Sequence, residues 1–115
     1  MIKSDTTLLK SCFADSMVLQ TIARGKSGGA EVKSETAATF VKSISSLKPG
    51  AADEQITFGT ILIDGPLALV WTPYKFYFNG QFSHCGVNSF HLVRFKDGWR
   101  IQYLIDTRRR TGCEN

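Results

Sequence analysis

The chain has 115 residues, of which 43% are hydrophobic and 21% charged, and three of its four net positive charges come from Arg108–Arg110. This length predicts one domain over residues 1–115 that buries roughly 65% of its unfolded surface without metals or disulfides. No apolar run reaches the length of a membrane span, the start lacks the apolar core of a signal peptide, and the arginine run is typical of a solvated tail, so we expect no membrane and no nucleic-acid partner.

The first half of the chain predicts two short strands and two helices. Ser4-Asp5 caps a short helix that ends at Lys10. Residues Met17–Ile22 alternate in polarity as a half-buried strand does, and Glu31–Lys33 are expected to pair back after a glycine-rich turn. We therefore expect an early strand followed by a short partner.

The second helix is predicted to start at Ser34, with Glu35 in its first turn, where a carboxylate suits the helix dipole. Pro49-Gly50 ends it. Its apolar stripe, which is expected to pack on a sheet, consists of Ala37, Phe40, Val41, Ile44 and Leu47.

Four antiparallel strands are expected to follow, because turn residues separate four apolar stretches. The turns are Asp64-Gly65-Pro66, Asn79-Gly80 and Asp97-Gly98, and the strands are Gln55–Ile63, Leu67–Phe78, Phe82–Phe95 and Trp99–Thr107. Helices early and strands late predict an α+β fold. Pro73 predicts a bulge or an edge, and a sheet bent in this way wraps a helix to form a cone-shaped cavity.

Several motifs in the strands resemble the nuclear transport factor 2-like superfamily, and within it the small bacterial proteins called lumazine-binding or SnoaL-like. The resemblance covers about Cys12 to Glu114. It rests on residues 68–77, on Ser83-His84-Cys85-Gly86-Val87, on Gly98-Trp99-Arg100-Ile101 and on Asp106-Thr107-Arg108-Arg109. It implies a cone-shaped, cystatin-like α+β domain with a pocket between sheet and helices, often a homodimer formed through the outer face of the sheet. We expect no cofactor. The superfamily usually opens with a long first helix, which we expect to be shortened or missing here.

We expect the aromatic-rich strands to wall a pocket for a small, partly apolar molecule. The ligand-binding candidates are Trp71, Tyr74, Phe76, His84, Asn88, Phe90 and Asp106. Tyr74, His84, Asn88 and Asp106 are predicted to form one polar cluster. Asp106, at the end of the last strand, is expected either to orient His84 or Asn88 or to bind an arginine such as Arg108.

The cluster depends on the turn lengths. A three-residue loop at Phe78-Asn79-Gly80 places Tyr74 opposite His84 and Phe76 opposite Phe82, whereas a two-residue loop places Lys75 opposite His84. In the next hairpin, a three-residue loop at Lys96-Asp97-Gly98 places Phe95 opposite Trp99 and Asn88 opposite Asp106. A turn of Asp97-Gly98 alone places Asn88 opposite Thr107 instead. The three-residue versions are favoured, because they pair Phe76 with Phe82.

The cysteines Cys12, Cys85 and Cys113 are odd in number and lack the spacing of a disulfide framework, so they predict free thiols in a reducing cytoplasm. His84 and Cys85 are adjacent in a strand and should point to opposite faces, which argues against a Cys–His nucleophile. One His-Cys pair also lacks the further ligands that zinc needs, so no metal is expected.

Three functions compete at this point. The first is a non-catalytic ligand-binding domain. The second is a cofactor-independent isomerase, cyclase or dehydratase in which His84 acts as base and Asp106 or Tyr74 orients it or supports an oxyanion. The third is homodimerisation through residues that face away from the pocket, namely Val87, Ser89, His91 and Val93.

Overall fold

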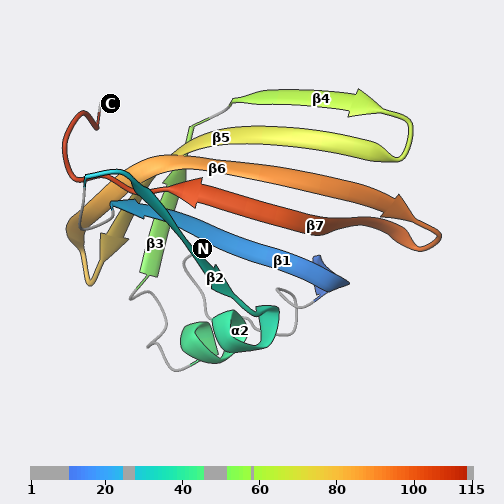
Figure 1. Ribbon diagram of the computed structural model, residues 1–115, viewed down its shortest axis with the longest axis horizontal. Coiled ribbons are helices and arrows are strands. Elements are labelled where there is room, and N and C mark those ends of the chain that lie inside the picture. The colour runs from blue at the N-terminus through green and yellow to red at the C-terminus, as the bar shows by residue number, and fades with distance from the viewer. Residues whose placement is uncertain (1–10, 25–27, 46–51, 58, 114–115) are drawn as a thin grey trace.

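The computed structural model describes residues 11–24, 28–45, 52–57 and 59–113. These residues form one helix and a sheet of seven strands in the order β2-β1-β7-β6-β5-β3, with β4 also paired to β5 (Figure 1). The elements are β1 (Phe13–Arg24), β2 (Ala30–Glu35), α2 (Ala37–Ser45), β3 (Ala52–Ile56), β4 (Thr60–Asp64), β5 (Leu67–Phe78), β6 (Gln81–Phe95) and β7 (Gly98–Thr107).

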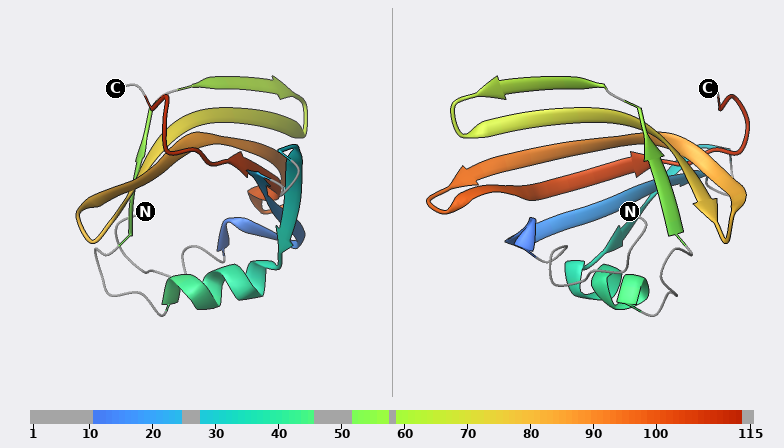
Figure 2. Two further views of the ribbon diagram at one scale, coloured as in Figure 1. Left: turned by 60° about the vertical axis from the view of Figure 1, so that its left-hand side comes forward. Right: turned by 180° about the vertical axis from the view of Figure 1, so that it is seen from behind.

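The sheet is strongly curved, and α2 lies across its open side (Figure 2). The α+β architecture is therefore as predicted, with one difference in the pairing. β1 pairs parallel with β7 while the other pairs are antiparallel, so the sheet is mixed. The predicted helix over residues 4–10 lies outside the described residues.

The buried core lies where α2 meets β1. Phe13, Met17, Leu19 and Val41 are all less than 9% exposed, and Phe40 packs against Phe13 with ring centroids 6.2 Å apart. Ala37, Ile101 and Leu104 complete this cluster. Apolar burial of this kind is the main force that holds a short helix on a sheet.

The helix starts two residues later than the sequence predicts. Thr36 is its N-cap, because the Thr36 Oγ1 accepts a hydrogen bond from the Thr39 backbone N–H at 3.0 Å. Ser34 and Glu35 instead end β2, where they pair with Gln20 and Leu19. The predicted stripe beyond Val41 extends into side chains outside the described residues.

The predicted strand Gln55–Ile63 is two strands in the structure. β3 pairs with the second half of β5 and β4 with its first half, so the partner of β5 changes near Pro73, which has no N–H to donate. Gly59 allows this change, since a Cβ there would lie 1.6 Å from the Trp71 carbonyl oxygen. The structure thus places the predicted Pro73 irregularity at a change of partner strand.

The hairpin between β5 and β6 has a two-residue turn, so the favoured three-residue loop is wrong. Asn79 and Gly80 both have positive φ, 51° and 79°, as a type I′ turn requires. Tyr77 therefore pairs with Phe82, and a one-residue bulge then places Phe76, rather than Tyr74 or Lys75, opposite His84.

The hairpin between β6 and β7 also has a two-residue turn. Phe95 pairs with Gly98 and Arg94 with Trp99, so the predicted pairing of Phe95 with Trp99 is wrong. A bulge at Gln102 then shifts the register by one residue and places Asn88 opposite Asp106. The predicted Asn88–Asp106 pair is therefore confirmed, although the turn that was meant to produce it is not.

The segment after β7 folds back on the sheet and is held there covalently. Cys85 and Cys113 form a disulfide, and the backbones of Cys85 and Arg109 exchange two hydrogen bonds of 2.8 Å. The prediction of three free thiols is wrong, because folding brings two cysteines 28 residues apart within bonding distance. Only Cys12 remains outside a disulfide in the described chain. The argument for a reducing cytoplasm rested on those thiols, whereas disulfides persist in oxidising compartments.

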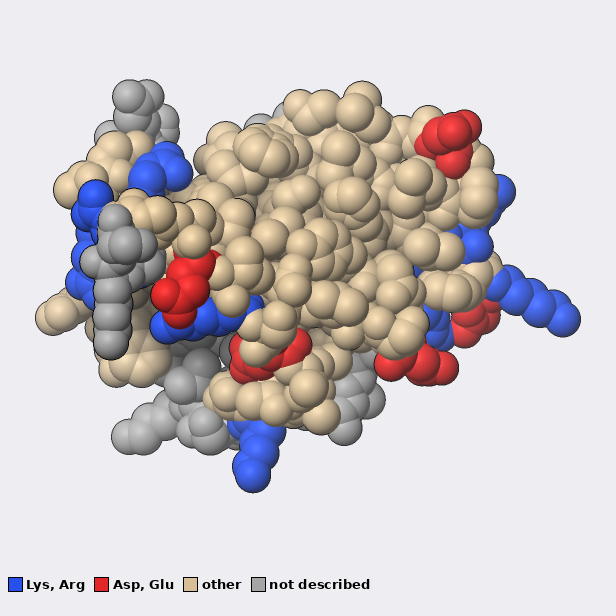
Figure 3. All heavy atoms as spheres, viewed as in Figure 1, with Lys and Arg blue, Asp and Glu red and all other residues tan. Residues whose placement is uncertain are grey.

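Charged side chains lie mainly toward the ends and the lower margin of the molecule in the view of Figure 3. The surface over the strands between them carries few charges. None of the described helical residues forms a segment long and apolar enough to cross a membrane.

Candidate functional site

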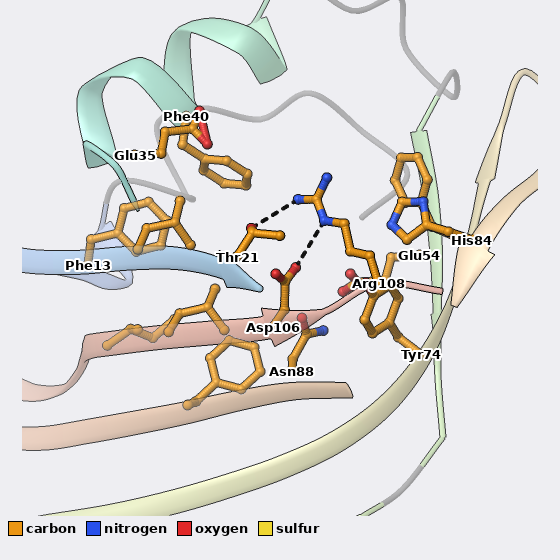
Figure 4. A pocket seen from close by; sticks show the side chains of 15 residues that line it. Phe13, Thr21, Glu35, Phe40, Glu54, Tyr74, His84, Asn88, Asp106 and Arg108 are labelled. Carbon is orange, nitrogen blue, oxygen red and sulfur yellow. Dashed lines mark hydrogen bonds and ion pairs between the residues drawn. The ribbon is translucent and has the colours of Figure 1, made fainter. Parts of the chain in front are cut away.

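A cavity of about 350 Å³ lies between the curved sheet and α2 (Figure 4). This volume falls at the lower end of the range for small-molecule sites. We call the side of the sheet that lines it the cavity face and the opposite side the outer face. The cavity is lined by Phe13, Leu19, Thr21, Glu35, Phe40, Glu54, Tyr74, Phe76, His84, Asn88, Phe90, Ile101, Leu104, Asp106 and Arg108.

The two ends of the cavity differ in chemistry. Phe13 and Phe40 lie at the end beneath α2 and belong to the core cluster. Tyr74, His84 and Arg108 lie toward the other end, near β3 and β5. The end beneath α2 therefore offers aromatic rings with the Glu35 carboxylate beside Phe40, and the other end offers the hydrogen-bonding groups of Tyr74, His84 and Arg108.

The four residues of the predicted polar cluster all line this cavity, from β5, β6 and β7. Phe76 and Phe90 line it as well. Each bulge shifts the strand pairing by one residue on one strand. Side chains still alternate between the two faces along each strand, so these residues lie on one face of the sheet.

Trp71 is the exception among the predicted ligand-binding residues. It is 49% exposed, is not among the lining residues and pairs with Ser89 on β6. Tyr74 lies three residues further along β5 and lines the cavity, and an odd separation along a strand places two side chains on opposite faces. Trp71 therefore belongs to the outer face.

Tyr74 and Asn88 are the most buried residues of the polar cluster, and each is 4% exposed. The Tyr74 hydroxyl donates a hydrogen bond to the backbone carbonyl of Thr107 at 2.8 Å. Burial, and next the carboxylate of Asp106, raise the pKa of Tyr74 well above its usual value. The tyrosine thus stays protonated and ties β5 to the end of β7.

His84 lies between two aromatic rings on the cavity face. It stacks on Phe76 with centroids 5.1 Å apart and meets Tyr74 edge-on at 5.7 Å. Its Nδ1 is 2.9 Å from the Ser83 hydroxyl oxygen. Burial lowers the pKa of His84 and the positive charge of Arg108 lowers it further, so the ring is neutral at pH 7.

Asp106 holds Arg108 over the cavity. The Arg108 Nε lies 3.6 Å from Asp106 Oδ2, and an Arg108 terminal nitrogen donates to the Thr21 hydroxyl at 3.4 Å, as the dashed lines in Figure 4 show. The other oxygen of the carboxylate, Asp106 Oδ1, is buried and has no hydrogen-bond partner in the described protein. Arg108 was expected in a solvated tail, but the structure places it in the cavity wall.

Sequence reasoning missed three polar lining residues: Thr21, Glu35 and Glu54. They lie on strands that precede the aromatic meander, and their pairing across the sheet has no local signal in the sequence. The expected pairing of Asp106 with an arginine such as Arg108 is confirmed. Among the described residues, no group of three or more His, Cys, Asp and Glu side chains is arranged to hold a metal ion.

No family model and no curated protein matches the chain. Solved structures do. An NTF2-like protein of unknown function from Shewanella baltica superposes with a TM-score of 0.70 at 12% identity, covering 96% of this chain and 82% of that one. The chain has the nuclear transport factor 2-like fold.

Two further structures share this NTF2-like fold. A domain of unknown function with a cystatin-like fold from Nostoc punctiforme has a TM-score of 0.68 at 14% identity, over 95% of this chain and 68% of that one. A protein from Streptomyces avermitilis described as a "putative dehydratase" of the NTF2-like family has a TM-score of 0.64 at 17% identity, over 92% of this chain and 83% of that one. At these identities the likeness establishes the fold alone, so the lumazine-binding or SnoaL-like assignment stays a prediction.

Proposed function

We propose that the chain binds a small, partly apolar organic molecule in the cavity and needs no cofactor to do so. The observation that carries this proposal is one cavity whose walls combine aromatic and aliphatic side chains with a few hydrogen-bonding groups. Mostly apolar walls with a few convergent polar groups are typical of small-molecule sites. Asn88 supports it too, because its amide is buried on the cavity face.

Fragment binding to two matched variants tests the proposal. Thr21→Trp fills the cavity, whereas Ile22→Trp places the same bulk on the outer face one residue later. Aromatic fragments observed by NMR should bind the wild type and Ile22→Trp, and Thr21→Trp should lose most of this binding. Equal binding to both variants would place the fragments elsewhere and reject the cavity.

A cofactor-independent isomerase, cyclase or dehydratase is the second candidate. It is supported by Tyr74, His84 and Asp106 on one cavity, with a neutral His84 available as a base. The fold neighbour described as a dehydratase is in line with it. His84→Gln separates the two functions: for a candidate substrate that the wild type converts, unchanged binding with undiminished turnover would exclude His84 as the base.

We further propose that the chain forms a homodimer through the outer face. Two large apolar side chains are exposed there, since Trp71 is 49% exposed and Leu62 on β4 is 59% exposed. Thr60, which pairs with Trp71 across β4 and β5, is exposed as well. His91 and Tyr103 form an edge-on ring pair further along the same face. Aromatic residues at the centre of an apolar surface are typical of subunit contacts.

Light scattering on the purified protein tests the dimer. The wild type should have the mass of two chains at micromolar concentration, and Trp71→Ser should weaken the dimer. Trp99→Ser is the control, because Trp99 lies near the β6–β7 turn, beneath the Arg94 guanidinium 5.6 Å from its ring centroid. A wild-type monomer at this concentration would reject the proposal.

A further inference from the structure

A row of polar side chains crosses the sheet at the cavity. The strand pairing places Thr72 opposite Asn88, Asn88 opposite Asp106, and Asp106 beside Thr21. The row therefore runs over β5, β6, β7 and β1 on one face. Each polar residue in such a row must find a hydrogen-bond partner when it is buried.

Two oxygens of this row lack a partner. Thr72 Oγ1 and Asp106 Oδ1 are both buried, and no group of the described protein hydrogen-bonds to either. They flank Asn88, whose amide carries both a donor and an acceptor. A buried carboxylate oxygen accepts hydrogen bonds and never donates them in its ionised form, so this end of the row needs a donor.

The charges around the cavity favour the same kind of group. Glu35, Glu54 and Asp106 line it with carboxylates, and Arg108 is the cation among the described lining residues, while Arg109 and Arg110 act on Tyr74 and His84 from outside the lining. The Arg108 guanidinium is already engaged by Asp106 at 3.6 Å and Thr21 at 3.4 Å. The cavity wall thus carries more negative than positive charge, which disfavours an anionic ligand.

We infer that the ligand carries a hydrogen-bond donor, as a hydroxyl or protonated amine, on an aromatic or alicyclic body, and that it carries no carboxylate or phosphate. Its apolar body contacts Phe13 and Phe40, and its donor reaches the Asn88–Asp106 part of the row. The inference rests on the proposed function, since it names the chemistry of that same cavity. It assigns Asp106 as the positioning group for the donor.

Three probes that share one body test it: 2-naphthylmethylamine, 2-naphthylmethanol and 2-naphthoic acid. Affinities are measured at pH 7 by protein-observed NMR titration of the full chain. The amine and the alcohol should each bind at least about tenfold more tightly than the acid, the amine most tightly, because a hydrogen bond to a charged acceptor carries that much free energy. Shifts should concentrate at the lining residues.

Variants identify the residue responsible. Asp106→Asn should reduce the preference of the amine over the acid by about tenfold, and Asp64→Asn, which removes the same charge from the exposed strand β4, should leave it unchanged. Glu54→Gln is the second cavity variant, should Asp106→Asn fail to fold. It should weaken the amine but not the alcohol.

The outcomes separate the two claims. Binding of the acid as tightly as the amine, with shifts at the cavity, would overturn the inference and leave the proposed function standing. Equal loss of preference in Asp64→Asn and Asp106→Asn would also overturn it, because the effect would then be one of net charge. Binding of none of the three probes at millimolar concentration would count against both claims.

Discussion

Alternating residues of the strands β5, β6 and β7 form the cavity face and the outer face of the sheet, and the two faces differ in their contacts. His84 and Cys85 are adjacent, yet His84 stacks on Phe76 inside the cavity while Cys85 lies under the C-terminal segment and is bonded to Cys113. The cavity face presents groups of which two have no protein partner, whereas the outer face at this point is closed by a covalent bond. The difference indicates that the disulfide stiffens the sheet from outside and leaves the cavity face open to a ligand.

Removing the disulfide should have the largest effect on stability. In the chain-entropy description, a cross-link between residues 28 apart in sequence contributes about 3.5 kcal/mol to the free energy of unfolding. Cys113→Ser should lose an amount of this order in urea unfolding, and a reductant should bring the wild type to the same stability. Cys12→Ser is the control, because Cys12 lies outside the disulfide and is exposed. A loss below about 1 kcal/mol would show that the outer face is held by packing and not by the cross-link.

A substitution at Gly86 tests the close contact between β6 and the end of β7. A Cβ at this position would lie 2.0 Å from the Thr107 carbonyl oxygen, so Gly86→Ala forces β6 away from the end of β7. We expect a loss of about 2–3 kcal/mol in urea unfolding. Gly29→Ala adds the same methyl group in open space and should change stability by less than about 0.5 kcal/mol. Similar values for the two variants would contradict the close approach.

Tyr74→Phe acts on the cavity face alone. It removes the 2.8 Å hydrogen bond to the Thr107 carbonyl, and the expected loss is about 1 kcal/mol in the same unfolding measurement. Tyr77→Phe is the matched control, because it removes the same hydroxyl from the same strand at a residue that pairs with Phe82 and does not bond Thr107. Should Tyr77→Phe cost as much as Tyr74→Phe, the loss would not be attributable to the Thr107 contact.

The smallest expected effect is the pH dependence contributed by His84. Its pKa is lowered in the folded state from the usual 6.5, so the unfolded chain takes up this proton first as the pH falls. The stabilisation is present above about pH 6.5 and is lost as the pH falls through the folded pKa. Unfolding curves of the wild type and His84→Gln between pH 8 and 4.5 should therefore converge toward acid. A constant difference would show that the His84 pKa is not shifted.

The strands were predictable from the sequence because turn residues with special backbone geometry mark their ends. Asn79-Gly80 is the clearest case, with both residues at positive φ. The registers were harder, because bulges at Ser83 and Gln102 have no local sequence signal. The predicted Asn88–Asp106 pair is present only because the bulge at Gln102 offsets the shorter turn.

The rest depended on contacts between distant segments. Cys85 and Cys113 meet because the chain after β7 turns back over β6, and nothing in an odd cysteine count indicates that path. Arg108 was predicted to lie in a solvated basic run, but its contacts with Asp106 and Thr21 hold its side chain in the cavity wall. Trp71 was assigned to the pocket by its aromatic character, although strand alternation counted from Tyr74 places it on the other face.

The parallel pairing of β1 with β7 has a consequence for synthesis. Leu19 lies beside Leu104, so β1 lacks its partner β7 until the chain has been synthesised some 85 residues further, by the residue numbers of this pair. Contacts this far apart in sequence slow folding, and the apolar residues of β1 remain exposed in the meantime. The addition of β7, rather than the formation of any single hairpin, is therefore the step that completes the wall of the cavity.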